Sequence, residues 1–162
     1  MNGHEHHHPQ SANAAVAAST LNRLALSATV HCLTGCAIGE VLGMVIGTAL
    51  GWGNVATIAL AVVLAFLFGY LLTMLPLLRA GLPMKQAART ALAADSVSIA
   101  IMEVVDNGVM LVIPGAMAAP LDAPLFWGSL ALALCLAGVA AYPVNRWLIA
   151  RGRGHAIVHQ HH

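Results

Sequence analysis

Two rows of residues, each at four-residue spacing, run along one apolar stretch near the start of the chain. The first row is Cys32, Cys36, Glu40 and Met44; the second is His31 followed by Gly35, Gly39, Gly43 and Gly47. Residues four positions apart share one face of a helix. Thiol, imidazole and thioether groups are soft or borderline ligands that favour copper first and zinc second. The stretch therefore predicts a transition-metal site beside a smooth glycine face.

A later apolar segment carries a second set of polar residues on one helical face. These residues are Glu103, Asp106, Asn107 and Met110, at spacings of three and four. Glu40 and Asp106 each lie about 15 residues from the same end of their segments, so at about 1.5 Å per residue they reach the same depth. An acid at membrane depth costs about 2.5–3.5 kcal/mol and marks function by default. We expect the two faces to meet around a metal ion, another cation, a proton or water.

Simpler interpretations of the same residues stay open. A buried cysteine is often only a small hydrophobic residue, and Met44 can serve packing alone. The His31 ring can bond a backbone carbonyl, and the acids can form a structural network with Asn107. Two other polar residues are expected to have no part in the site: Asp95 as a helix N-cap or interfacial residue, and Cys135 as a core residue.

The elements that must position these residues are membrane helices. Of the 162 residues, 59% are hydrophobic and only 8% are charged, and the mean hydropathy is +0.81. Soluble proteins average about 25% charged residues. Four apolar segments at about 24–50, 55–78, 91–113 and 126–149 are each long enough to cross a bilayer. The sequence predicts an all-α, four-helix membrane domain over residues 23–151, with a flexible tail at 1–22 and a histidine-rich tail at 152–162.

The basic residues predict the orientation of this bundle. All seven fall on one side of the four-helix arrangement: Arg23, Arg79, Lys85, Arg89, Arg146, Arg151 and Arg153. The positive-inside rule then places both termini in the cytoplasm. The predicted location is a cell membrane, with a prokaryotic inner membrane favoured.

These observations lead to one functional hypothesis and two alternatives. The first is a membrane protein that binds and moves or delivers a transition-metal ion, with histidine tails that concentrate the ion. The second is a proton or cation channel built on Glu40, Glu103 and Asp106, in which the cysteines only pack. The third is a non-catalytic assembly or scaffold protein.

Other partners and activities follow from the same patterns. The lipid bilayer is the expected surrounding, and the glycine face predicts close helix packing and self-association as a homo-oligomer. The sequence has no catalytic motif, such as a nucleotide-binding glycine loop or an H-E-x-x-H pattern, so we expect no enzyme. No nucleic-acid partner is expected.

The chain also resembles a known family. The resemblance rests on the run from His31 to Gly43, on Glu103-Val104-Val105-Asp106-Asn107 and on Tyr142-Pro143-Val144-Asn145-Arg146-Trp147. It covers residues 24 to 155 or so and points to small prokaryotic integral membrane proteins that carry a domain of unknown function. The resemblance implies a four-helix membrane fold and supplies neither an activity nor site residues.

Overall fold

A computed structural model describes the backbone of residues 9–151 and the side chains of residues 16–151. The described chain is all helical. It contains the helices α1 (Pro9–Ala49), α2 (Asn54–Arg79), α3 (Met84–Val112) and α4 (Pro124–Ala150), with a 3₁₀ turn, η1 (Ala116–Ala118), before α4. The histidine-rich segments at 4–8 and 155–162 lie outside the described residues, so their predicted role in metal capture stays a prediction.

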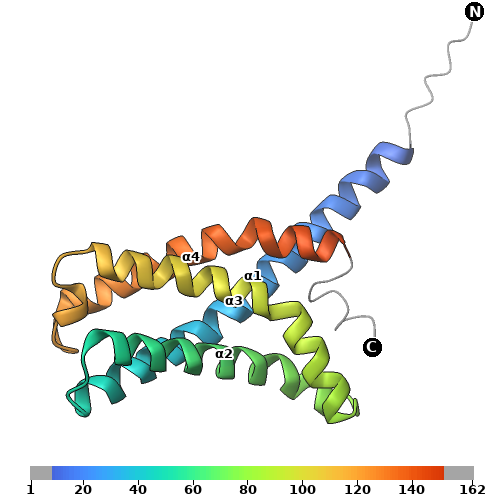
Figure 1. The fold of residues 1–162 in the computed structure, drawn as a ribbon. Helices are drawn as coiled ribbons and strands as arrows, with labels where there is room; N and C mark the ends of the chain where they lie inside the picture. The colour runs from blue at the N-terminus through green and yellow to red at the C-terminus, as the bar shows by residue number, and fades with distance from the viewer. Residues whose placement is uncertain (1–8, 152–162) are drawn as a thin grey trace, which may run out of the picture.

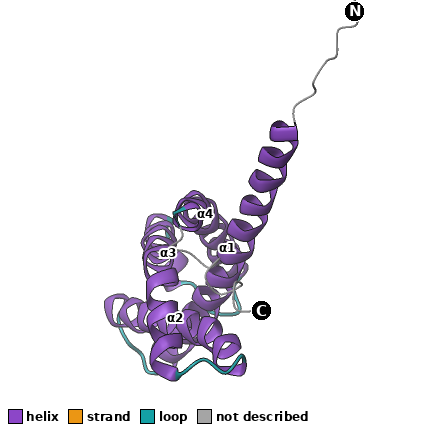
Figure 2. Cartoon of the chain, turned by 90° about the vertical axis from the view of Figure 1, so that its right-hand side faces the viewer, coloured by secondary structure: helices purple, strands orange, loops and turns teal. Residues whose placement is uncertain are grey.

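Each helix runs antiparallel to its neighbour in the chain, and α1 continues beyond the bundle at its N-terminal end (Figure 1). Each helix packs against its neighbours in the chain, and α4 closes the bundle against α1. Figure 2 views one end of this arrangement, in which α1 and α3 lie diagonally opposite each other. Residues that face inward from α1 and α3 therefore meet at the centre of the bundle.

The sequence predicted the helix ends better than the helix starts. The expected ends at 50, 78, 113 and 149 each lie one residue from the observed ends. However, α1 begins at Pro9 rather than near residue 24, and α3 begins at Met84 rather than near 91. Both extra segments are rich in alanine, which has the highest helix propensity. They are too polar to be predicted as membrane-spanning helix from the length of an apolar segment.

Three helices are long and apolar enough to cross a membrane: Val16–Ala49 of α1, α2 and α4. Helix α3 is not one of them because it carries acidic and basic residues. Its acids face inward, however, and its outward face carries Leu92, Val97, Val104 and Leu111. Such an arrangement, apolar outside and polar inside, suits a helix surrounded by lipid.

The glycine face of α1 packs against α2. A Cβ atom added at Gly35 would lie 2.6 Å from the Cα of Gly69, and one at Gly43 would lie 2.5 Å from the Cα of Ala61. The predicted close helix packing is therefore confirmed. Within the chain, α2 covers the face from Gly35 to Gly47; the expected self-association stays a prediction.

All described basic residues are exposed, and most lie near the end of the bundle that holds the turn at 80–83. We call this end the basic end; it lies to the right in Figure 1. The long connection at 113–123 and the turn at 50–53 lie at the opposite end. The depth of a residue in α1 or α3 is its distance along the helix from the basic end.

Candidate functional site

The centre of the bundle holds a group of acids that we call the acid layer. It consists of Glu40 from α1 and Glu103, Asp106 and Asn107 from α3. Glu40 is 3% exposed, Glu103 4% and Asp106 2%. Glu40 and Asp106 line the same small cavity at the centre of the bundle. The predicted meeting of the two helix faces is confirmed.

Asn107 braces one acid of this layer. Its Nδ2 donates to the backbone oxygen of Glu103, at 3.0 Å, and to Oε2 of the same residue, at 3.3 Å. The second carboxyl oxygen of Glu103 and one oxygen of Asp106 have no protein donor, and neither does either oxygen of Glu40. The amide therefore satisfies Glu103 in part and leaves both oxygens of Glu40 and one oxygen of Asp106 without a donor.

The described lysines and arginines cannot compensate these acids, because every one of them is exposed at the surface. Two carboxylates in a buried site repel each other, and the usual solution is that one of them holds a proton. A proton shared between Glu40 and Asp106 would convert repulsion into an O–H···O hydrogen bond. A bound cation would serve the same purpose.

A small cavity adjoins the Glu40–Asp106 pair. All four helices and η1 supply residues to its lining: Glu40, Met44, Ala61, Asp106, Asn107, Met110, Met117 and Leu130. Its volume of about 10 Å³ is close to what one water molecule requires. The expected convergence of Met44 and Met110 on the acids is confirmed, and Met117 of η1 is an addition. A single water or monatomic ion fits here.

A second polar group lies closer to the basic end, and we call it the inner layer. It consists of Cys32 from α1 and Asp95 and Ser98 from α3, all at most 1% exposed. The Cys32 thiol donates to Asp95 Oδ1 over 3.6 Å, and the buried Ser98 hydroxyl has no hydrogen-bond partner among the described residues. Asp95 is thus a buried residue inside α3, and its expected place at a helix N-cap is wrong.

Helices α2 and α4 also supply polar groups near the inner layer. His31 Nε2 lies 3.1 Å from the hydroxyl of Thr73 on α2. Asn145 on α4 donates from Nδ2 to the hydroxyl of Thr29, at 2.9 Å. The bundle therefore has polar contacts between α1 and each of the other three helices at this depth.

Cys36 lies between the two layers. Its thiol is 3.9 Å from the sulfur of Met102. The surrounding residues are tightly packed and apolar, and they include Ala65, Ile99 and Ala137, each 0% exposed. An apolar layer that includes Cys36 and Met102 thus separates the two polar layers.

The predicted metal ligands do not gather at one point. The ring of His31 contacts α2, Cys32 contacts Asp95, and Cys36 contacts Met102. Within the part of the chain that was searched, no group of three or more His, Cys, Asp or Glu side chains is placed to hold a metal ion. The metal role of these residues stays a prediction. All three cysteines are free thiols, and Cys135 is exposed on α4, so its expected core position is wrong.

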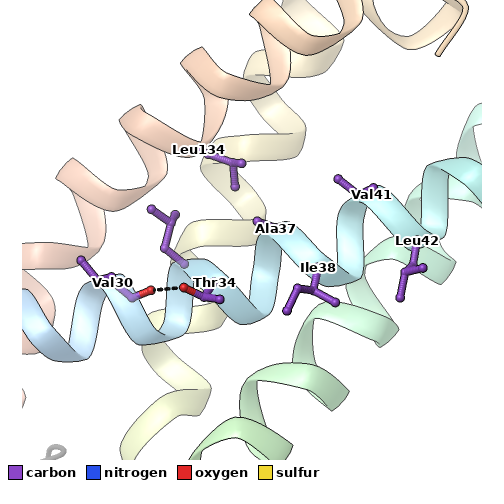
Figure 3. A pocket seen from close by; sticks show the side chains of 8 residues that line it. Val30, Thr34, Ala37, Ile38, Val41, Leu42 and Leu134 are labelled. Atoms are coloured by element: carbon purple, nitrogen blue, oxygen red, sulfur yellow. Dashed lines mark hydrogen bonds between the residues drawn. The ribbon is translucent and has the colours of Figure 1, made fainter. Parts of the chain in front are cut away.

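The opposite side of α1 carries an apolar groove, shown in Figure 3. Aliphatic side chains such as Val30, Ile38 and Leu134 line it. The one hydroxyl, on Thr34, donates to the backbone oxygen of Val30 at 2.8 Å. Because this groove offers no unsatisfied polar group, the chemistry of the molecule lies on the α3-facing side of α1.

The sequence matches the family described as a domain of unknown function (DUF4396) over residues 21–154. The chain belongs to this family, and the match covers all of the acid layer and the inner layer. No match was found among curated proteins or among solved structures.

Proposed function

We propose that this chain is an integral membrane protein that binds a small cation in its acid layer and moves it across the bilayer. The Glu40–Asp106 pair carries the proposal. Two buried carboxyl groups line the same small cavity, neither oxygen of Glu40 has a protein donor, and the described lysines and arginines are all exposed. Such a pair is stable only with a proton or a cation between its members. Intramembrane acids commonly mark ion pathways.

The proposal includes four membrane crossings with both termini in the cytoplasm. The inward position of the α3 acids and the apolar outer face of α3 support the fourth crossing. The exposed basic residues near one end of the bundle support the orientation, through the positive-inside rule. Single cysteines placed in a chain without native cysteines test this. A membrane-impermeant maleimide should label Asn54→Cys from outside the cell and should not label Gly81→Cys.

The test of function is ion flux into liposomes that contain the purified protein. We expect flux by the wild-type protein and at least a ten-fold loss in Glu40→Gln, which keeps the size of the side chain and removes the charge. Asp122→Asn is the matched control, because Asp122 is an exposed acid in the connection before α4. No flux above empty liposomes for any of H⁺, Na⁺ or K⁺, or unchanged flux in Glu40→Gln, would overturn the proposal.

A transition-metal cargo is the second candidate, and one observation favours it. The sulfur-containing side chains of Met44, Met110 and Met117 line the cavity beside the acids, and thioethers are ligands for Cu(I). Leucine at all three positions preserves volume and removes sulfur. If the cargo is Cu(I), this triple variant should lose Cu(I) binding in a competition assay with a chelator. Cys32→Ser with Cys36→Ser then shows whether the thiols add affinity.

A further inference from the structure

We propose that the outer face of α1 binds one anionic phospholipid, with the lipid phosphate at Arg23 and an acyl chain in the apolar groove beside α4. The groove and the acid layer lie on opposite sides of α1, so this site is separate from the proposed ion pathway. The two sites can therefore be tested independently.

The groove offers a surface that suits hydrocarbon. It runs along α1 from Val30 to Leu42, with Leu134 of α4 at its side, and its volume is about 590 Å³ (Figure 3). At about 1.5 Å per residue, this length of helix covers about 18 Å. One leaflet makes up half of the hydrocarbon core of about 30 Å. The groove is therefore long enough to hold an acyl chain of one leaflet.

Polar side chains continue the same side of α1 toward the basic end. A second hollow, of about 240 Å³, is lined by Thr20, Arg23, Leu24 and Ser27. Ser27 and Val30 are three positions apart, so the two hollows follow one another along one side of the helix. Thr20 Oγ1 donates to the backbone oxygen of Val16 at 2.9 Å. The Arg23 guanidinium and the Ser27 hydroxyl are then the donors that can reach a ligand.

Within residues 16–151, no carboxylate balances the charge of Arg23. Four of the acids in this range are buried inside the bundle, and the fifth, Asp122, lies in the connection at the opposite end. An anion from outside the chain is therefore the natural partner of the guanidinium. Arginine binds phosphate oxygens through two parallel N–H···O bonds. The combination of this cation with an apolar groove matches a molecule that is both anionic and lipidic.

The contacts around Arg23 fit the level of lipid headgroups. Arg146 of α4 donates from Nε to Oδ1 of Asn22 at 2.8 Å, which brings a second guanidinium to this depth. The next residue, Trp147, is 48% exposed, and the guanidinium of Arg151 lies 4.2 Å from the centre of its ring. Exposed tryptophan side chains collect at the headgroup level. With the phosphate at Arg23, the lipid ester groups lie near Ser27, about 6 Å deeper along α1.

A lipid fits this face better than a second copy of the chain. In a dimer with its two-fold axis along the membrane normal, the same residues meet at the same depth, so Arg23 would face Arg23. Helix pairs in membranes favour small residues at their contact, whereas this groove is lined mainly by valine, leucine and isoleucine. Two copies of one groove also leave a gap between them, and a flexible acyl chain fills such a gap.

The experiment is native mass spectrometry of the full-length protein with equal amounts of phosphatidylglycerol and phosphatidylcholine that carry identical acyl chains. We expect one phosphatidylglycerol per chain, retained about five-fold in preference to phosphatidylcholine, which is the factor that one basic residue contributes at an anionic surface. Arg23→Gln should lose this preference. The matched control Arg79→Gln, at the exposed end of α2, should keep it. Equal retention of the two lipids by the wild type, or an unchanged preference in Arg23→Gln, would overturn the proposal.

A bulky side chain in the groove tests the acyl-chain site. Ala37 is half-buried in the groove, so Ala37→Phe should lose at least five-fold in phosphatidylglycerol retention. Ala93→Phe is the control, because Ala93 is exposed on α3, and circular dichroism establishes that both variants are folded. Glycerol phosphate, which has no acyl chain, should not compete with the lipid. Competition by glycerol phosphate, or a lipid-free dimer that Ala37→Phe dissociates, would overturn the proposal.

Discussion

Replacement of Gly39 by alanine should loosen the contact between α1 and α2. A Cβ at this position would lie 2.6 Å from the carbonyl carbon of Leu64 and closer still to the backbone of Ala65. Non-bonded carbon atoms prefer about 3.5–4.0 Å, so the two helices would have to separate by about 1 Å. The atoms in the way are backbone, which cannot rotate aside. Overpacking of this kind costs about 1–3 kcal/mol.

The matched control is Gly128→Ala on α4, where an added Cβ meets nothing within 4 Å. Alanine in an open helical position is more favourable than glycine by up to about 1 kcal/mol. Unfolding in detergent, followed by circular dichroism during an SDS titration, should therefore show Gly39→Ala below the wild type and Gly128→Ala at or above it. Equal midpoints for the two variants would refute the close α1–α2 contact.

Two further predictions concern the polar contacts and the thiols. Thr29→Val removes the acceptor of the Asn145 amide, so it should lower the free energy of unfolding by about 1–3 kcal/mol. The double variant with Asn145→Leu should lose less than the sum of the two single losses, and additive losses would show that the two side chains do not interact. N-ethylmaleimide should modify the exposed Cys135 first in folded protein, and Cys32 and Cys36 only after unfolding in SDS. Rapid modification of all three thiols in folded protein would contradict the burial of Cys32 and Cys36.

The depth of the acids could be predicted from the sequence because depth depends only on position along a helix. Counting residues at a fixed rise predicts equal depth for Glu40 and Asp106, and in the structure both line the same small cavity. Helical periodicity also grouped Glu103 with Asp106. The glycine row was likewise a sound signal for close packing, because only a backbone surface can approach it.

The partners of each face could not be predicted, because periodicity does not say which helix covers which face. The row that begins with His31 faces α2, while the cysteine row faces α3. This separation splits the predicted His-Cys-Cys group. The burial of Asp95 could not be predicted because the residue lies near the basic end, where an acid ordinarily reaches water. Its burial depends on α1, which supplies Cys32 at the same depth.

The Glu40–Asp106 pair can be examined directly by infrared spectroscopy of the protein in lipid at neutral pH. We predict a carbonyl band from a protonated carboxyl group, shielded from rapid hydrogen–deuterium exchange because the pair is buried. The band should disappear or shift in both Glu40→Gln and Asp106→Asn and stay unchanged in Asp122→Asn. A spectrum without any protonated carboxyl band, or a band that both central variants leave intact, would contradict a shared proton at the centre of the bundle.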